Sequence, residues 1–543
     1  MDITRRNLLA ASGLGALGMM GYAGLTQPLG NTVLTKSASG LADRDMPRPY
    51  RAAFRPLPRL APYQVLTDAD GVRVERYSVT ARAGTASILP KYTTPVIGYN
   101  GMVPGPTISV ERGTQVRLRV RNGLTGVRHA SHADHESISL STHLHGHASA
   151  PEFDGYAGDL TGPGYYKEYV YENDQAARSI WYHDHASHQT TMNVYSGLAA
   201  QYLIHDEVER ALLPQGDFDV PLTLCDMMFE ADGRVRFDDD EHSGVWGDVV
   251  LVNGQPWPVM QVQRRVYRFR LLNASMSRSY RPYLSTGEPV HMVATDGGLM
   301  PVSRPVTRWR HSPAERYEFL VDFSRYAPGT TVRLRNASNP KNVDFDHTDE
   351  IMAFTVTDAP VDTSDPTWRA IPQTLASSEV MSLDPATSRR RRRLHLKRND
   401  QTNIWNINEE TWSDVVASGY TRVLANPGLG DVETWDLETS SGGWFHPLHV
   451  HLVDFKILSR NGRPPFDYER GPKDVAYVGP DELVRVLMRF DRRGKYMVHC
   501  HNLPHEDHDM MHQFAVGLTP GQPDAHDPIT TAPALLDTFP PDA

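Results

Sequence analysis

The feature that most constrains this chain is a run near its C-terminal end, from Tyr496 to Met510, in which one cysteine stands between two histidines. The run reads as a β-strand that leads into a loop. Side chains alternate between the two faces of a strand, so His499 and His501 point to one side and Cys500 points to the other. We therefore expect the thiolate and the two imidazoles to serve separate metal centres that covalent bonds connect.

The residues after this strand indicate the ligands of the thiolate centre. His505 and Met510 follow at a distance that lets them fold back onto the side of Cys500. One cysteine, histidine nitrogens and a weak thioether form the ligand set of a blue-copper electron-transfer site. Such a site needs a second histidine from elsewhere in the chain, and the imidazoles on the opposite face need partners too.

Paired histidines supply both needs. The chain holds 24 histidines in 543 residues, and the spacing His-x-His recurs more often than chance would give. This spacing places both rings on one face of a strand, but imidazole suits copper, zinc, iron and nickel alike. Cys500 with His446, His505 and Met510 favours copper. The four clusters are His143-Leu144-His145, His183-Asp184-His185, His446 to His451, and His499-Cys500-His501.

Length, charge and cysteine content exclude several classes of protein. A chain of 543 residues is too long for one domain and suits three of ordinary size. The net charge of -10 argues against nucleic acid as a partner. Because there are only two cysteines, metal binding by Cys500 leaves no internal disulfide. Cys225 lies in an apolar, strand-like run and is expected to be a buried, inert thiol.

The N-terminus predicts where the protein goes. Arg5 and Arg6 form a twin-arginine pattern, and an apolar run of small residues without acidic side chains follows to about Leu25. We interpret residues 1–42 as a twin-arginine signal peptide and leader, which predicts export to the periplasm or the outside of the cell. The alternative is a membrane anchor, because the apolar run is borderline in length. No other stretch is apolar enough to span a bilayer.

Alternating patterns predict an all-β chain. Val116, Leu118 and Val120 alternate with arginines, and the run from Tyr267 to Leu271 does the same. A Pro-, Ser- and Thr-rich link ends in five arginines, Arg389 to Arg393, which we interpret as a solvated strand start; an anion or membrane patch is the alternative. The predicted units are a first domain at 43–206, a second at 207–358, a linker at 359–393, and a third domain with a C-terminal tail at 394–543.

These motifs, in this order and spacing, resemble the multicopper oxidases, in particular the branch that contains bilirubin oxidases and spore-coat laccases. The resemblance covers nearly the whole chain after the signal segment, including Leu251-Val252-Asn253-Gly254 of the second domain. It implies three cupredoxin-like Greek-key β-barrel domains. The other residues that carry it are His143 to Gly146, Phe153-Asp154-Gly155, Trp181 to His185, Trp444-Phe445-His446, and His499 to Met511.

The resemblance implies four copper ions: one type 1, one type 2 and two type 3. It gives His446, Cys500, His505 and axial Met510 to the type 1 ion. The first and third domains each supply four histidines to the other three ions. These are His143 and His449 for type 2, and His145, His183, His185, His451, His499 and His501 for type 3.

The reaction that the resemblance implies couples the oxidation of organic donors to the reduction of dioxygen. A bilirubin-like tetrapyrrole, a phenol or an aromatic amine gives single electrons to the type 1 copper through an exposed edge of His446, and four electrons reduce dioxygen to water. Glu506 and Asp154 are expected to supply protons, although either could instead cap a turn or hold a histidine. Trp444 lies two residues before His446 and is expected to stack against a planar donor, with simple packing as the alternative.

Other functions fit the sequence less well. A general laccase differs only in the pocket over His446, whereas a metal-ion oxidase is disfavoured because no Met-rich insertion is present. A non-enzymatic scaffold of the same fold would have lost the ligands. Three loop histidines, His129, His132 and His135, could bind a further metal, but we interpret them as solvated; His147 and His188 are expected to be bystanders. We expect a monomer with no nucleic-acid partner.

Overall fold

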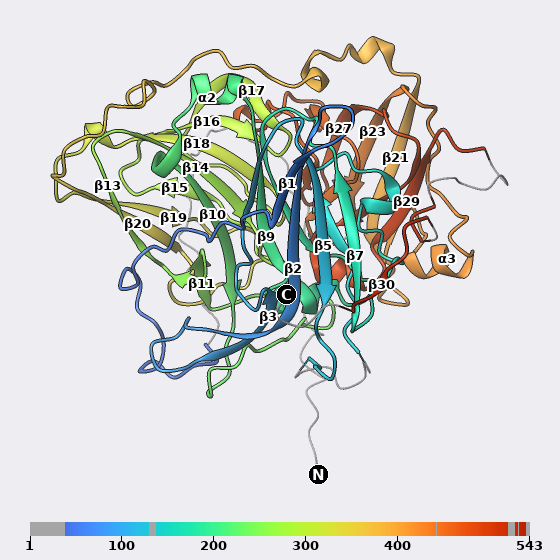
Figure 1. Ribbon diagram of the computed structural model, residues 1–543, viewed down its shortest axis with the longest axis horizontal. Coiled ribbons are helices and arrows are strands. Elements are labelled where there is room, and N and C mark those ends of the chain that lie inside the picture. Colours follow the sequence, from blue (N-terminus) through green and yellow to red (C-terminus); the bar gives the residue numbers. More distant parts are fainter. Residues whose placement is uncertain (1–38, 130–136, 441, 520–526, 530, 539–543) are drawn as a thin grey trace, which may run out of the picture. The chain divides into compact units, whose positions relative to one another are not determined.

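The structure is a computed structural model that describes residues 39–129, 137–440, 442–519, 527–529 and 531–538. Residues 1–38 of the predicted signal peptide and leader, together with His132 and His135, lie outside the described residues, whereas Leu41 of the same segment is buried in the apolar core of the predicted second domain. The described part folds mainly into β-strands, which confirms the all-β prediction (Figure 1). None of its helices is long and apolar enough to cross a membrane. Its α-helices are short: α1 (Thr190–Ser196), α2 (Glu207–Leu212), α3 (Trp412–Ala417) and α4 (Leu503–Asp507).

The first group of strands forms two sheets with one apolar core. Val116, Leu118 and Val120 are buried on one face, as their alternation predicts, and share the core with Tyr182 and Ile204 of the other sheet. One sheet has the order β1 (Gln64–Thr67), β2 (Arg73–Ala86), β5 (Gln115–Asn122) and β7 (Tyr165–Tyr171), with β3 (Thr94–Tyr99) on β2. The other has the order β4 (Ile108–Glu111), β9 (Ala199–His205), β8 (Arg178–Asp184) and β6 (Thr142–His145).

The second group repeats this arrangement with a larger sheet. Its strand β14 is buried on both faces because Arg268 and Arg270 pair with the buried carboxylates of Glu209 and Glu318. The larger sheet has the order β12 (Gln255–Pro256), β11 (Val249–Val252), β10 (Asp219–Met227), β14 (Val266–Asn273), β18 (Arg316–Asp322), β16 (Val290–Thr295) and β17 (Gly298–Val306). The smaller has the order β13 (Val259–Val262), β20 (Glu350–Val356), β19 (Thr331–Asn336) and β15 (Pro282–Leu284).

The third group carries most of the C-terminal histidines. One sheet has the order β22 (Trp405–Ile407), β21 (Arg390–Arg398), β23 (Val432–Thr439), β27 (Leu483–Arg489) and β25 (Phe455–Arg460). The other has the order β26 (Val475–Val478), β24 (His446–Val450), β28 (Gly494–Cys500) and β29 (Met511–Val516). Trp435 and Val486 of the first sheet and Val498 and Phe514 of the second lie in one core.

Two details refine the predicted organisation, whose domain boundaries remain predictions. Strand β21 begins at Arg390, four residues inside the predicted linker, and its arginines pair with carboxylates of β23, such as Arg392 with Glu433. These pairs agree with a strand start rather than an anion patch. The C-terminal tail returns to the first group, where β30 (Leu535–Leu536) pairs with β7 (Figure 1).

Strand β28 shows why one short strand can serve two centres. Tyr496, Val498 and Cys500 point into the core of the third group, as period-two alternation requires. Met497, between them, packs on the opposite face against Tyr156 and Ala157 of the first group. His499 is on that same face, so the strand lies between the core of its own domain and the first domain.

Candidate metal centre

Two pairs of strands bring the histidine clusters into register. His143 on β6 lies opposite His183 on β8, and His449 on β24 lies opposite His499 on β28. His143 Nε2 and His449 Nε2 are 3.4 Å apart, although more than three hundred residues separate them in the chain. The first and third groups of strands therefore meet at their histidines, as the sequence predicts.

Cys500 and two histidines converge on one point. Cys500 Sγ lies 3.5 Å from His446 Nδ1 and 3.7 Å from His505 Nδ1, and those two nitrogens are 3.2 Å apart. An ion at about 2.0–2.3 Å from each donor in tetrahedral geometry separates its ligands by roughly 3–4 Å, so the spacing suits a bound metal. Met510 is fully buried. It lies beside these ligands because its backbone N–H donates to the His505 carbonyl and its own carbonyl accepts from Cys500 N–H.

The eight remaining histidines divide into a pair and two triads. His143 and His449 form the pair. One triad, His145, His183 and His501, and the other, His185, His451 and His499, each bring three ring nitrogens within 4.8 Å of one another. In the second triad, His499 Nε2 lies 3.1 Å from His185 Nε2 and 3.2 Å from His451 Nε2. The sequence predicts these six residues as one set; the structure shows how they group.

Hydrogen bonds to one nitrogen of several rings leave the other nitrogen facing the cluster. Nδ1–H of His143 donates to the carbonyl of Asp154, that of His183 to the carbonyl of Asp184, and that of His449 to the carbonyl of Asp474. Buried nitrogens of His145, His183 and His501 have no hydrogen-bond partner among the described residues. A buried polar atom without a partner is costly, so these atoms fit residues that bind metal.

The electrostatics also suit metal binding. Burial lowers the pKa of His185 to about 4 and the pKa values of His446 and His499 to about 3. The imidazoles are thus neutral at neutral pH, the form that binds metal. Burial raises the pKa of the Cys500 thiol well above its usual range, so metal binding must displace the thiol proton.

Two carboxylates predicted from the sequence lie beside the triads. Asp154 Oδ2 accepts a hydrogen bond of 2.8 Å from His451 Nδ1. Glu506 Oε2 lies 2.8 Å from His499 Nδ1, without the alignment of a hydrogen bond. Both carboxylates are buried. Burial raises the pKa of Glu506 to about 7 and the pKa of Asp154 well above its usual range.

Asp474 and Arg316 also belong to the site, although no sequence motif predicts them. Asp474 Oδ1 accepts from His145 Nε2 at 3.1 Å and from Arg316 Nη1 at 2.7 Å, and all three side chains are buried. Arg316 belongs to β18 of the second group, which supplies none of the predicted ligands but holds one of them through Asp474. A Lys-Asp pair, Lys473-Asp474, between apolar residues was the only local signal.

The prediction that an edge of His446 is exposed is wrong, because this residue is fully buried. Trp405 packs edge-on against the His446 ring, with centroids 5.4 Å apart, and stacks on His505 at 3.8 Å. Trp444 is half-buried and packs edge-on against His505 at 5.4 Å. Trp246 stacks beside it at 6.3 Å, so tryptophans rather than histidine edges cover the thiolate centre.

The remaining histidines singled out from the sequence, together with Cys225, lie outside the candidate metal centres. Both ring nitrogens of His147 are bonded, to Ser149 and to the backbone of Asn173, so the ring has none free for a metal. His129 is buried and bonds to Asn193, so it is not the solvated loop residue we predicted. His188 Nδ1–H donates to the carbonyl of Asp507. Cys225 is half-buried and not buried as predicted, but desolvation still raises its pKa to about 12, which suits an inert thiol.

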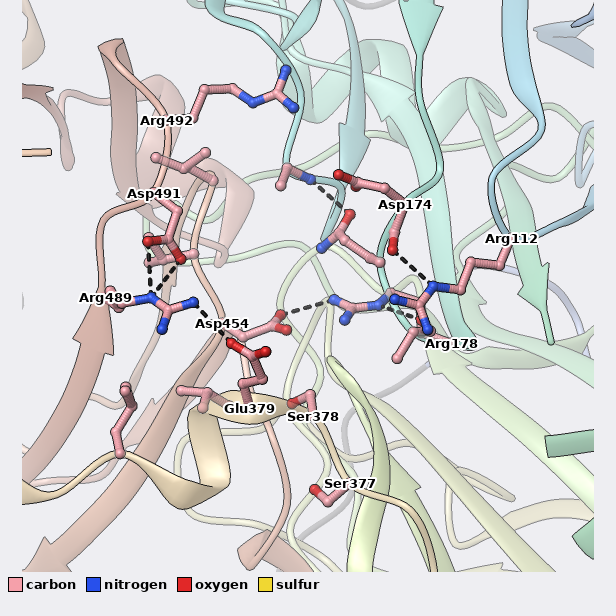
Figure 2. A pocket seen from close by; sticks show the side chains of 17 residues that line it. Arg112, Asp174, Arg178, Ser377, Ser378, Glu379, Asp454, Arg489, Asp491 and Arg492 are labelled. Carbon is pink, nitrogen blue, oxygen red and sulfur yellow. Dashed lines mark hydrogen bonds and ion pairs between the residues drawn. The ribbon is translucent and has the colours of Figure 1, made fainter. Parts of the chain in front are cut away.

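A cavity of about 550 Å³ is lined by residues of the first and third groups of strands and of the segment that precedes β21 (Figure 2). Its charges pair across the wall: Arg178 Nη1 donates to Asp454 Oδ1 at 2.9 Å, and Arg489 pairs with Asp491 and Glu379. Arg178 also lies 3.5 Å from the carbonyl of Gly146, the residue after His145. The cavity thus holds a network that ties the first and third groups together beside the cluster.

Comparison with known proteins agrees with this geometry. Residues 80–209 and 388–519 match family models described as multicopper oxidase. A bilirubin oxidase from Albifimbria verrucaria is 40% identical over 483 residues, covering 85% of this chain and 80% of that protein. A laccase from Bacillus subtilis strain 168 is 32% identical, covering 76% of this chain and 88% of that protein.

Solved structures are similar over the same span. A laccase from Pediococcus acidilactici matches with a TM-score of 0.73 at 28% identity, covering 89% of this chain and all of that one. McoA multicopper oxidase from Aquifex aeolicus matches with the same TM-score and identity, covering 86% of this chain. The three groups of strands are therefore cupredoxin-like domains, and the chain belongs to the multicopper oxidases.

Proposed function

We propose that this oxidase holds four copper ions and oxidises bilirubin-like tetrapyrroles, phenols or aromatic amines. The type 1 ligands would be Cys500, His446, His505 and Met510. The type 2 ligands would be His143 and His449, and each histidine triad would hold one type 3 ion. The observation that carries this proposal is the convergence of neutral, buried imidazole nitrogens at three points, next to a fourth point that holds a buried thiol.

Copper, when bound, supplies the one-electron redox chemistry by which electrons from the donor reach dioxygen. The chain provides the connection between the centres, since Cys500 is bonded through the backbone to both His499 and His501. His499 belongs to one triad and His501 to the other. Each triad is therefore linked to the thiolate by a short covalent route, and burial of the whole segment excludes water from it.

Protons would come from Glu506 and Asp154. Glu506 lies between His185 and His499 of one triad, at 3.6 and 2.8 Å from their Nδ1 atoms. Asp154 is placed between His143 and His451, with its carboxylate 3.7 Å from His143 Nδ1. A buried carboxyl group with a raised pKa, beside rings of the cluster, can act as a general acid in the reaction. Asp154 also orients His451, so the two roles expected for this residue are compatible.

The donor would stack against Trp444. This indole is half-buried and lies between Trp246 and Trp405, and Lys341 Nζ is 5.2 Å from the ring centroid. A planar aromatic donor can pack against such a face, and the lysine favours donors with carboxylates. Trp405 packs against Trp444 and stacks on His505. These rings connect Trp444 with the thiolate centre.

The test compares a bulky donor with a small one. Trp444→Ala should lower kcat/KM for bilirubin far more than kcat/KM for ferrocyanide, because only the planar donor uses the indole face. Copper content is measured in each protein, and Phe466→Ala, which removes an exposed aromatic ring elsewhere in the third domain, serves as the control. Equal losses for both donors at full copper loading would show that Trp444 tunes the copper site and does not select the donor. That result would favour a general laccase.

Export by the twin-arginine route and a monomeric state are further parts of the proposal. Arg5 and Arg6 support the first, and they precede an apolar run without acidic residues. Changing both to lysine should leave the protein in the cytoplasm, which cell fractionation measures; normal export of the double variant would exclude this route. Size-exclusion chromatography with light scattering tests the monomer.

A further inference from the structure

A second group of metal-binding side chains lies outside the predicted copper sites. Asp239 Oδ2 is 2.7 Å from His242 Nδ1 and 3.4 Å from His508 Nε2. Two histidine nitrogens from different domains thus converge on one carboxylate oxygen. The two imidazole rings stack with centroids 3.1 Å apart, closer than the 5.1 Å between His446 and His505, so the rings would move apart to bind one ion.

The geometry points to a binding site for one divalent transition-metal ion, of the class of Zn²⁺ or Cu²⁺, held by Asp239, His242 and His508. Ligands at about 2.0–2.2 Å from such an ion lie roughly 3 to 3.5 Å apart, which the 3.4 Å between Asp239 Oδ2 and His508 Nε2 matches; the 2.7 Å contact with His242 is a hydrogen bond, which a bound ion would replace. Two imidazoles and one carboxylate form a ligand set that binds zinc and copper. The side chains are partly exposed, at 23% for Asp239, 45% for His242 and 37% for His508, so an ion can reach them.

The surroundings complete the site. A cavity of about 280 Å³ is lined by Asp239, His508 and His188 and leaves room for water ligands. Asp238, Asp240 and Glu241 flank Asp239 in the sequence, and their carboxylates favour a cation over an anion at this place. His188 directs its Nδ1–H to a carbonyl and is not needed as a ligand.

The backbone is arranged to present His242. Asp240, Glu241 and His242 have φ values of 49°, 51° and 67°, three consecutive residues in the left-handed region. Such conformations cost energy for residues other than glycine and persist where the surrounding structure enforces them. Here the enforcing contacts belong to the thiolate centre. Trp405 Nε1–H donates to the carbonyl of His242 at 2.9 Å, and His505 Nε2 bonds to the carbonyl of Ser243 at 3.1 Å.

The bound ion would thus fasten a loop of the second domain to the ligand loop of the third. The segment from Asp239 to Ser243 covers the thiolate centre, and His508 follows helix α4, which carries His505. An ion bridging His242 and His508 would hold this cover in place. The inference does not depend on the donor proposed above or on the assignment of the four copper ions.

Zinc uptake by the copper-loaded enzyme tests the site. The protein is freed of loosely bound metal with a chelator and dialysed against Zn²⁺, and zinc and copper are counted by elemental analysis. Wild type should bind one zinc ion per chain. The affinity for this ion should fall at least tenfold in each of the variants Asp239→Asn, His242→Ala and His508→Gln. The control is His395→Ala, which removes an imidazole whose Nε2 bonds to Ser440, away from the proposed site, and should leave zinc binding unchanged.

Copper content and the blue absorption band of each variant show that the fold and the other sites are intact. Zinc should also raise the Tm of wild type and of the control, but not of the three variants, because it binds the folded cover only. The same zinc affinity in wild type and in all three variants, or no zinc beyond the copper complement in wild type, would overturn the inference.

Discussion

Asp474 offers the sharpest test of how the second domain supports the cluster. Its carboxylate accepts from His145 and pairs with both terminal nitrogens of Arg316, and each of these residues is at most 1% exposed. Asp474→Asn keeps the size of the side chain and one acceptor oxygen. It removes the negative charge that the buried guanidinium faces.

The size of the effect follows from this burial. Removing one partner of a buried ion pair costs about 3–5 kcal/mol, because the other charge is left uncompensated. Asp296 Oδ1 lies 3.8 Å from Arg316 Nη1 and offsets part of this loss, and the amide oxygen retains a hydrogen bond. We therefore expect a loss of about 2–3 kcal/mol in the free energy of unfolding. Losing the partner of a metal-binding histidine should also weaken copper binding by about 10- to 100-fold.

Two assays measure the two effects. Urea unfolding followed by tryptophan fluorescence gives the change in stability, and copper retention against a competing chelator gives the change in affinity. The matched control is Asp436→Asn, in the same domain. Asp436 also pairs with two arginines, Arg391 and Arg485, but these are exposed by 58% and 32%, so its loss should cost less than about 1 kcal/mol. Equal costs for the two variants, or full copper retention in Asp474→Asn, would refute the reasoning.

Three further predictions concern the copper ligands and their neighbours. Met510→Leu should raise the type 1 reduction potential and Met510→Gln should lower it, because the axial donor tunes the potential; redox titration measures both, and no change in either variant would remove Met510 from the site. Glu506→Gln should slow reoxidation by dioxygen by about 10²-fold or more while anaerobic bleaching by the donor stays near normal; stopped-flow absorbance separates the steps, and slow bleaching with normal reoxidation would contradict the proton role. The copper-free protein should lose stability as pH falls below about 6.5, by roughly 1.4 kcal/mol per pH unit for each buried histidine. Burial lowers the pKa values of these histidines in the folded state, so only the unfolded chain takes up the protons. Acid titration of the copper-free and copper-loaded forms checks this, and identical midpoints would count against it.

The grouping of the candidate ligands could be predicted because these residues follow local rules. Period two in a strand separates Cys500 from its two neighbours, and the structure keeps that separation. The His-x-His spacing likewise predicted which residues share a face. Strand alternation around Val116 to Val120 predicted the buried side of β5 in the same way.

What the sequence could not show depends on contacts between distant residues. The burial of His446 depends on Trp405, which lies forty-one residues earlier and has no fixed spacing to it. The Arg316–Asp474 pair and the approach of His242 to His508 each join two domains. Local patterns carry no information on such pairs. The start of β21 was placed four residues late because the run of like charges from Arg390 to Arg393 gives no alternating apolar pattern, and the carboxylates of β23 that pair with these arginines lie about forty residues away in the chain.

Metal analysis of Cys500→Ser beside wild type tests the central claim most directly. Wild type should bind four copper ions per chain and show an intense blue band. In Cys500→Ser the band should vanish, because it requires a thiolate ligand, and three coppers should remain, because none of the eight histidines of the cluster is changed. A variant that stays blue, or a wild type that binds copper with no blue band, would contradict the assignment.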